Sequence, residues 1–503
     1  MRERLAARLP SALLVSVFVL LVVPAIAGAA IAVGHIEVAV LLAGAVVGWA
    51  LYDKVSLTGW VALTLLTSVA IRLPISLLHL PDPLKFLHFP VVVAFAVAAA
   101  TRPPQEQARP AAHWLLGLLA LTGLSMVANL TNPLRALLFV TLLGEPLLVV
   151  WAVLRWGADA ESQRRVGVFW TALVLVQLPV DLWQFATLGL GDPIAGTLMG
   201  SSVGAHQMGS LFALSLLMVV AAVLAGKASR VAGFIAGALV ITVLIAADAK
   251  QILVSLAVAL VAISLLFGRG RSGGPGRSRR SPLSLATVTA ILVASLSMVA
   301  LGAVYPGIFV RIKDLADPSQ LPETKLLIDR ARSNRLELVF GSGPGTSASR
   351  ASLLLVDISR LPKDSPRRLI DLPPTPLGVE LAGQSRSRNP IYGGSAESSA
   401  HSVLGILGDL GLVGVCALWL LFVLIWKQVR RRGSWLAPAA CGALIMTSII
   451  IFIDGWLEFP EYALPLAFLL GFALSRTEHG PAPEAASPEE VEELGLPAAL
   501  PGR

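Results

Sequence analysis

Charged residues are scarce in this chain of 503 residues, of which Asp, Glu, Lys and Arg together make up only 14%. Soluble domains carry about 25% charged residues, so the composition excludes an ordinary water-soluble enzyme. Hydrophobic residues make up 55% of the chain and its mean hydropathy is +0.77. A membrane-spanning helix needs about 20 consecutive apolar residues. The composition therefore predicts a protein that crosses the membrane many times.

Cysteine is almost absent, and several short motifs are missing. Cys416 and Cys441 both lie inside apolar runs, a context that argues against a disulfide framework or a cysteine metal site. The chain has no GxxxxGK[ST], HExxH, CxxC or Asp-x-Asp pattern, which disfavours ATP-driven transport and metal-dependent transfer. We therefore expect neither a metal nor another cofactor.

Fourteen apolar runs are long enough, or nearly so, to cross a membrane. Four of them are short or interrupted, so a count of twelve spans is the alternative. The sequence predicts an all-α, polytopic transmembrane bundle whose runs are 11–33, 36–52, 57–71, 86–101, 112–130, 134–154, 166–188, 206–226, 231–248, 251–267, 283–304, 402–426, 435–455 and 462–475.

The positions of Lys and Arg indicate the orientation of these runs. With the N-terminus inside, the inner connections hold 20 Lys and Arg and the short outer connections hold four. Basic residues favour the cytoplasmic side, so we expect both termini there.

The first apolar run exceeds the 7–15 residues of a signal-peptide core and predicts an uncleaved span. The basic loop 268–282 is rich in Gly and Ser, and we interpret it as a cytoplasmic connection rather than a nucleic-acid site.

Four regions follow from this topology. Residues 1–304 form a membrane bundle of about eleven spans, and residues 305–401 form one large extracytoplasmic loop domain. Residues 402–475 hold three more spans, and residues 476–503 form a disordered acidic cytoplasmic tail with six Glu. Inside the loop domain, residues 322–339 predict an amphipathic helix that ends at a glycine-rich turn.

Ionisable residues at membrane depth are costly and are often functional. Most of them lie near predicted span ends, where long side chains reach water at little cost. Lys250 is different because it lies in a tight turn beside Asp248, where a structural ion pair and a ligand-binding role both remain open. The full set comprises Arg72, Glu145, Asp181, Asp248, Lys250, Asp409, Asp454, Glu458 and Glu461.

His401 lies at the outer mouth of a predicted span, with Asp409 about two helical turns later. This pair can act as a general base with an orienting acid, although a single histidine can also be a solvated or capping residue. His206, at the outer mouth of another span, is its competitor.

The stretch 401–421 resembles the signature of the O-antigen ligase and polysaccharide polymerase superfamily. That signature is His-Asn, a few apolar residues, an acidic residue and Gly-x-x-Gly, and this chain supplies His401, Asp409, Gly411 and Gly414. A glycine turn in the large outer loop, Gln184 near the end of an apolar run, and the Gly- and Ser-rich turn 196–204 agree with the resemblance, which covers about residues 166–475. Ser402 replaces the usual Asn, and Asp409 replaces the usual Glu.

The resemblance implies a metal-independent glycosyltransferase of the bacterial inner membrane whose donor is a glycan on undecaprenyl diphosphate. It implies that His401 is the catalytic base and that the other site residues bind substrate. Of the latter, Arg332 and Arg335 are three residues apart, so we expect them to share one helix face. The predicted substrate-binding residues are Lys250, Arg330, Arg332, Arg335, His206, Asp409, Gly341, Gly343 and Gly345.

The leading hypothesis is a polymerase that joins lipid-linked repeat units into exopolysaccharide, O-antigen or capsule. Its nearest alternative is a ligase that moves finished glycan onto lipid A-core; the extra spans and Lys250 depart from the ligase pattern. A transporter or flippase of lipid-linked sugars is an alternative of another class, although we find no two related halves in the sequence. Expected partners are the bilayer, the glycan donor and acceptor, a chain-length regulator and a repeat-unit flippase.

Overall fold

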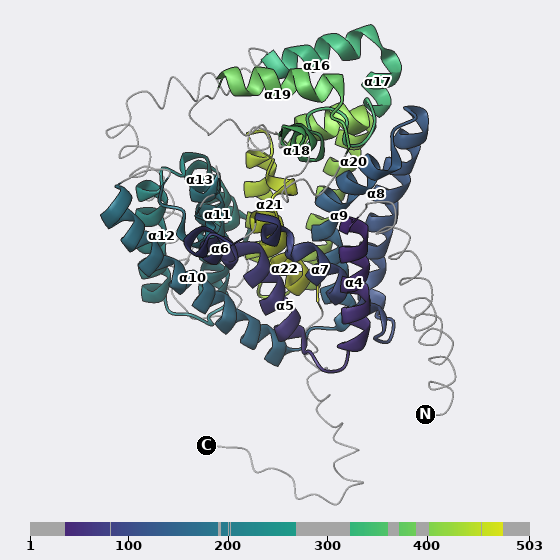
Figure 1. Cartoon of the computed structure of the whole chain (residues 1–503). Coiled ribbons are helices and arrows are strands. Elements are labelled where there is room, and N and C mark those ends of the chain that lie inside the picture. Colours follow the sequence, from purple (N-terminus) through teal and green to yellow (C-terminus); the bar gives the residue numbers. More distant parts are fainter. Residues whose placement is uncertain are drawn as a thin grey trace, which may run out of the picture.

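The computed structural model describes residues 36–80, 82–189, 193–199, 201, 203–267, 322–360, 372–388, 402–453 and 455–475. Every regular element within these ranges is helical, and none is a strand (Figure 1). The predicted all-α class is therefore confirmed for the described part of the chain. Two predicted runs (11–33 and 283–304), the basic loop 268–282 and the tail 476–503 lie outside it.

The other twelve predicted apolar runs each coincide with a helix or a broken pair of helices. The membrane bundle contains α4 (Ile36–Ala50), α5 (Leu57–Leu65), α6 (Arg72–Leu78), α7 (His88–Ala100), α8 (Arg109–Ala128), α9 (Pro133–Trp156), α10 (Ala160–Leu188), α11 (Gly204–Leu224), α12 (Arg230–Ala246), α13 (Lys250–Phe267), α20 (Ser402–Arg432), α21 (Ala437–Ile450) and α22 (Pro460–Leu474). Among the described helices, six are long and apolar enough to cross a membrane, or seven if one bent pair counts as a span. Four further apolar helices are shorter. These helices indicate a multi-pass membrane protein.

The bent pair is α5 and α6. The predicted run 57–71 continues through the π-helical turn Leu66–Ala70 and bends by 46° before α6. A π turn breaks the regular hydrogen-bond ladder of a helix, and Pro74 lacks the amide that would help to restore it. The bend directs Arg72 at the start of α6 toward the centre of the bundle, where it meets Glu461.

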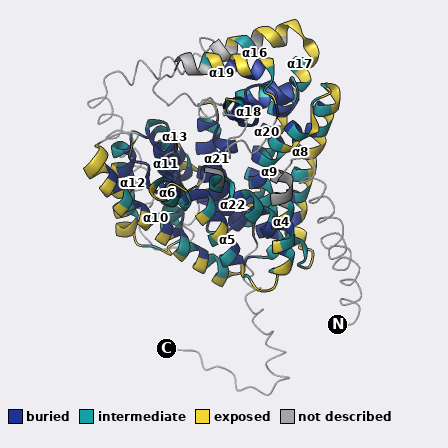
Figure 2. Ribbon diagram, in the orientation of Figure 1, coloured by how far each residue is buried: buried dark blue, intermediate teal, exposed yellow. Residues whose placement is uncertain are grey.

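The centre of the bundle is α22, in which every residue is buried. It packs against α9, α11, α20 and α21 and appears dark in the middle of Figure 2. Close packing elsewhere uses glycine: a Cβ on Gly44 or Gly48 of α4 would lie 2.4 or 2.1 Å from a carbonyl oxygen of α7. Small residues four apart allow two membrane helices to approach this closely.

Four helices form a cap at one end of the bundle, which we call the cap end (Figure 1). They are α16 (Pro322–Ser333), α17 (Arg335–Phe340), α18 (Arg350–Ser359) and α19 (Pro376–Arg388). The predicted single helix 322–339 is therefore wrong in one respect, because it breaks at Asn334, whose side chain caps α17. Arg332 and Arg335 consequently belong to different helices and do not share one helix face.

The opposite end of the bundle, which we call the basic end, carries cations at the helix connections. The Arg102 guanidinium lies 4.3 Å from the ring centre of Trp156, and the Lys227 ammonium lies 4.7 Å from that of Trp435. These contacts join connections that the charge pattern assigns to the cytoplasm. Helix α9 begins beside the cap, where the Arg135 guanidinium donates to the Pro373 carbonyl, and ends at Trp156, so the cap and the basic connections lie at opposite ends of the bundle.

Candidate functional site

The glycine-rich turn after α17 packs directly against the start of α20. Gly341, Gly343 and Gly345 all adopt positive φ, between 70° and 106°. A Cβ on Gly341 would lie 2.3 Å from the backbone carbon of Asp409, and one on Gly343 would lie 1.9 Å from the Thr131 hydroxyl. Only glycine combines this backbone conformation with such close approach. The structure therefore brings the predicted glycines and Asp409 together.

Asp409 is fully buried, and its carboxylate accepts four hydrogen bonds from the segment that follows the turn. One oxygen accepts from the amide of Gly345 at 2.6 Å and the hydroxyl of Ser349 at 2.5 Å. The other accepts from the amide and hydroxyl of Ser347, at 2.8 and 2.5 Å. A buried carboxylate requires such donors to offset the loss of water. Asp409 thus fixes the turn and the first residues of α18.

The Asp409 segment of α20 is not a regular helix. Gly411 has φ 67° and ψ −163°, which breaks α20 into two helical parts. Its missing side chain leaves space for α17, because a Cβ there would lie 2.3 Å from the carbonyl oxygen of Val339. Gly408 similarly leaves space for Ser347. The glycines of this motif therefore create the surface on which the turn and α17 pack.

Arg350, the first residue of α18, connects the cap to the turn before α22. Its amide donates to a carboxylate oxygen of Glu458 at 2.6 Å, and its guanidinium donates to the Glu458 carbonyl at 2.5 Å. The same guanidinium lies 4.6 Å from the ring centre of Phe459. Burial raises the pKa of Glu458 to about 8, and the Asp409 carboxylate adds to this rise, whereas Arg350 opposes it.

A second group of buried polar side chains lies deeper, and we call it the buried ion cluster. Arg72 of α6 donates to one oxygen of Glu461 at 2.5 and 2.8 Å, and Gln207 of α11 donates to the other at 3.4 Å. His88 of α7 lies 3.6 Å from Glu145 of α9, nitrogen to oxygen, and both side chains are at most 4% exposed. Five helices therefore converge on this cluster.

Gln184 organises the connection between α10 and α11. Its side-chain oxygen accepts from the amides of Ala195 and Gly196 at 2.8 and 2.9 Å, and its nitrogen donates to the Gly196 carbonyl at 2.8 Å. Gln177, two turns earlier, accepts from the Thr197 amide at 2.8 Å. The Gln184 position noted in the sequence therefore holds the connection that leads into His206 and Gln207.

The predicted cations are not brought together within the described residues. Lys250 forms an ion pair with Asp248 at 2.8 Å, on a helix that packs against α11, α12 and α21. Arg330 pairs with Glu337 at 2.5 Å in the cap. Arg332 pairs with Asp329 at 3.7 Å, and Arg335 is exposed.

The two predicted histidines differ in what the structure describes. His206 lies in the first turn of α11, beside Gln207 of the buried ion cluster. His401 lies outside the described residues. Ser402, which follows it, is fully buried, and its hydroxyl accepts from the amide of Leu457, the residue before Glu458, at 3.1 Å. The chain at this point therefore lies against the Glu458 turn.

Several site residues were missed or interpreted otherwise in the sequence. Arg350 carries no local signal, because it is one of many arginines in a charged loop. Arg72, Glu145, Glu458 and Glu461 were noted as ionisable, but a buried pair cannot be distinguished from a snorkelling side chain until its partner is known. His88 falls inside the predicted run 86–101 and is not among the ionisable residues noted there.

The chemistry of this region is that of buried charges and hydrogen-bond donors. In the part of the chain that the structure describes, no three His, Cys, Asp or Glu side chains are grouped so as to hold a metal ion. The glycine turn, Asp409, Arg350 and Glu458 form one connected unit between the cap and the bundle. Comparisons of the chain with protein-family models, with curated proteins and with solved structures find no match in any of the three.

Proposed function

We propose that the protein is a membrane glycosyltransferase that joins undecaprenyl-diphosphate-linked repeat units into a surface polysaccharide. In this proposal it lies in a bacterial inner membrane with fourteen spans and both termini in the cytoplasm. The loop domain 305–401 lies on the outer face, where the lipid-linked units are joined. Transfer needs no metal in this mechanism.

The observation that carries the proposal is the contact between Asp409 and the glycine turn. These are two separate parts of the superfamily resemblance, and the Gly345 amide and the Asp409 carboxylate are 64 residues apart in the sequence. Two unrelated short patterns have no reason to meet in space. Their contact, with Arg350 beside it and the chain after His401 against Glu458, supports a single site at the cap end of the bundle.

The proposed reaction forms a glycosidic bond and breaks the bond between the sugar and the diphosphate. The acceptor hydroxyl loses its proton to His401 and attacks the anomeric carbon, while the diphosphate leaves with the bonding electrons. A histidine with a pKa of about 6.5 can accept this proton near neutral pH. Fixed cations stabilise the charge on the leaving group; Lys250, Arg330, Arg332 and Arg335 are the proposed residues, and none of them is in contact with Asp409 in this structure.

Two other functions differ from the proposed one. A ligase differs in its acceptor, and a transporter differs in that it carries out no reaction. A ligase would use the same site and donor but would transfer to lipid A-core. A transporter or flippase of lipid-linked sugars is favoured by one observation, the buried ion pair of Arg72 and Glu461, because intramembrane ion pairs often serve in transport. A transporter would move the substrate without consuming it.

Reconstitution in proteoliposomes tests the proposal. Purified protein receives a defined undecaprenyl-diphosphate-linked repeat unit, and products are separated by length. We expect a ladder of polymer together with release of undecaprenyl diphosphate. If the lipid-linked unit remained intact and only changed leaflet, the transporter would replace the transferase.

Histidine variants test the site within the same assay. A positioned base contributes about 10²–10⁴-fold, so His401→Ala should leave at most about one per cent of the rate at equal membrane abundance. His206→Ala is the matched comparison, since it lies at the mouth of another span. Loss only in His206→Ala would move the base to that residue, and normal rates in both would exclude histidine as the base.

A further inference from the structure

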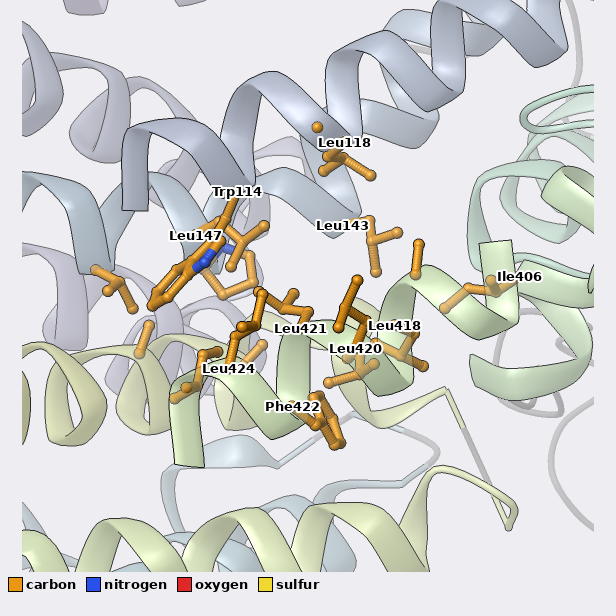
Figure 3. A pocket seen from close by; sticks show the side chains of 18 of the residues that line it. Trp114, Leu118, Leu143, Leu147, Ile406, Leu418, Leu420, Leu421, Phe422 and Leu424 are labelled. Carbon is orange, nitrogen blue, oxygen red and sulfur yellow. The ribbon is translucent and has the colours of Figure 1, made fainter. Parts of the chain in front are cut away.

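An apolar cavity with a volume of about 340 Å³ lies among α8, α9, α20 and α22. The side chains labelled in Figure 3 are aliphatic or aromatic and come from these helices, among them Trp114, Leu118, Leu143, Leu418 and Leu421. An apolar cavity at membrane depth is suited to a hydrocarbon chain and not to a sugar, because it offers no partners for hydroxyl groups.

The cavity extends along α20 from the Asp409 segment toward the basic end, since its lining runs from Ile406 to Ile425. Ile406 and Leu410 line it beneath the Asp409 segment, and both are at most 2% exposed. At the other end, His113, Trp114 and Leu424 also line a second, open cavity of about 630 Å³. A hydrocarbon chain would therefore enter from the basic end.

Four of the seven residues that line the open cavity have polar side chains, although most of its lining surface is apolar. Arg109, His113 and Gln428 line it and supply hydrogen-bond donors, whereas Glu106 is the opposing acidic residue. Gln428 lies in the stretch 427–432, which also holds one Lys and three Arg. Trp114 lies between the polar and apolar parts, a position that tryptophan favours at membrane surfaces.

We propose that these two cavities bind one anionic phospholipid from the leaflet at the basic end, with an acyl chain in the apolar cavity and the phosphate near Arg109 and His113. The proposal is independent of the transferase activity, since it concerns a lipid that enters through the open cavity at the basic end. Basic residues near a membrane surface favour anionic lipids. The lipid would connect the α8–α9 pair to α20, which carries Asp409 at its other end.

Gly117 provides a direct test, because it lines the apolar cavity and a Cβ there would meet no atom within 4 Å. Gly117→Phe should fill the cavity without displacing a neighbour. Gly123 lies on the same helix, also has open space, and does not line the cavity, so Gly123→Phe is the matched control. Native mass spectrometry of the full chain with added phosphatidylglycerol measures binding; we expect at least tenfold weaker binding for Gly117→Phe and no more than a twofold change for Gly123→Phe.

Charge reversal tests the headgroup. Arg109→Glu should weaken phosphatidylglycerol binding about tenfold or more and leave phosphatidylcholine binding unchanged. The control is Arg164→Glu, an exposed arginine of α10 outside both cavities. Equal binding of the two lipids by the wild type, or equal behaviour of the two phenylalanine variants, would overturn the proposal. Specific retention of a polyprenyl phosphate in place of phosphatidylglycerol would overturn it too, because the cavity would then hold the donor lipid.

Discussion

Asp409 and Glu458 are both buried carboxyl groups of the same site, but their surroundings differ. Asp409 receives four donors, two on each oxygen. Glu458 receives the Arg350 amide on one oxygen, and its pKa is raised to about 8 because burial penalises the charged form. The oxygens of Asp409 are both occupied by donors, whereas the raised pKa of Glu458 favours its protonated form near neutral pH.

Asp409→Asn should destabilise the protein although the substitution preserves shape. The amide group of Asn would face amide or hydroxyl donors, so at least one buried donor would lose its acceptor. Such a loss costs about 1–3 kcal/mol, and more where a charge is involved; we expect a loss of about 3 kcal/mol in the free energy of unfolding. Denaturant titration in detergent measures this. Asp329→Asn, at an exposed ion pair of the cap, should change the same quantity by less than about 0.5 kcal/mol, and equal effects would contradict the assigned role.

Glu458→Gln should change the pH dependence of stability. The folded-state pKa is raised from 4.5 to about 8, so the unfolded chain loses this proton at lower pH than the folded chain does. The contribution of the neutral carboxyl is therefore complete below about pH 4.5 and is lost as the pH rises through about 8. The melting temperature of the wild type should fall over this window, and the fall should be smaller in Glu458→Gln. Identical slopes for the two proteins would contradict the raised pKa.

At the scale of elements, the break in α20 is the feature that shapes the site. At the break, Gly411 lies directly against α17, because a Cβ there would lie 2.3 Å from the carbonyl oxygen of Val339. The positive φ at Gly411 interrupts α20, and the helix resumes after it. The break therefore lets one membrane helix both hold Asp409 and pack against the cap.

Gly411→Ala should be far more damaging than Gly433→Ala. Both glycines have a positive φ, 67° and 64°, so an alanine is strained at each position by at least about 1 kcal/mol, and the ψ of −163° at Gly411 lies in a region that only glycine readily adopts. Only at Gly411 would the added carbon meet another backbone, since Gly433 has no atom within 4 Å of that position. We expect Gly411→Ala to lose about 1–3 kcal/mol more than Gly433→Ala, measured by thermal unfolding in detergent. A similar loss in both variants would mean that the contact with α17 is unimportant.

The elements were largely predictable from the sequence, whereas their breaks were not. Apolar runs located the helices because burial in lipid requires long apolar stretches. The break at Asn334 and the π turn at 66–70 depend on local hydrogen bonds that hydropathy does not report. Pro74 indicates an interruption after the run 57–71, but hydropathy does not show that the bend brings Arg72 to Glu461.

The site was predictable only in its local patterns. The glycine turn and Asp409 were recognised separately, but their contact joins residues 64 apart and depends on how the cap folds over the bundle. Arg350 was missed because its significance comes entirely from Glu458, more than a hundred residues later. A sequence pattern identifies a residue that differs from its neighbours in the chain. Arg350 and Glu458 become distinctive only through their contact in the fold.

At the scale of the whole molecule, the cap and the basic connections lie at opposite ends. This arrangement predicts that alkaline phosphatase fused after Pro344 is active and that the same fusion after Lys227 is inactive. The reason is that alkaline phosphatase is active only outside the cytoplasm. Pro344 lies in the glycine turn under the cap, and Lys227 lies in a connection at the basic end. The reverse pattern would invert the orientation and remove the proposed outer-face site.

The central position of α22 has a consequence for how the protein is made. This helix is the last one described in the chain, yet every residue in it is buried and it packs against helices that enter the membrane much earlier. About a hundred residues separate α18 from α22, which corresponds to roughly 5–20 s of synthesis at 5–20 residues per second. Arg350 is therefore synthesised this long before Glu458, and Arg72, which is 389 residues from Glu461, precedes its partner by more than three times that interval. The central helix of the bundle is therefore synthesised after the helices that pack around it. A chain released before α22 is made would lack the helix at the centre of the bundle rather than one at its periphery.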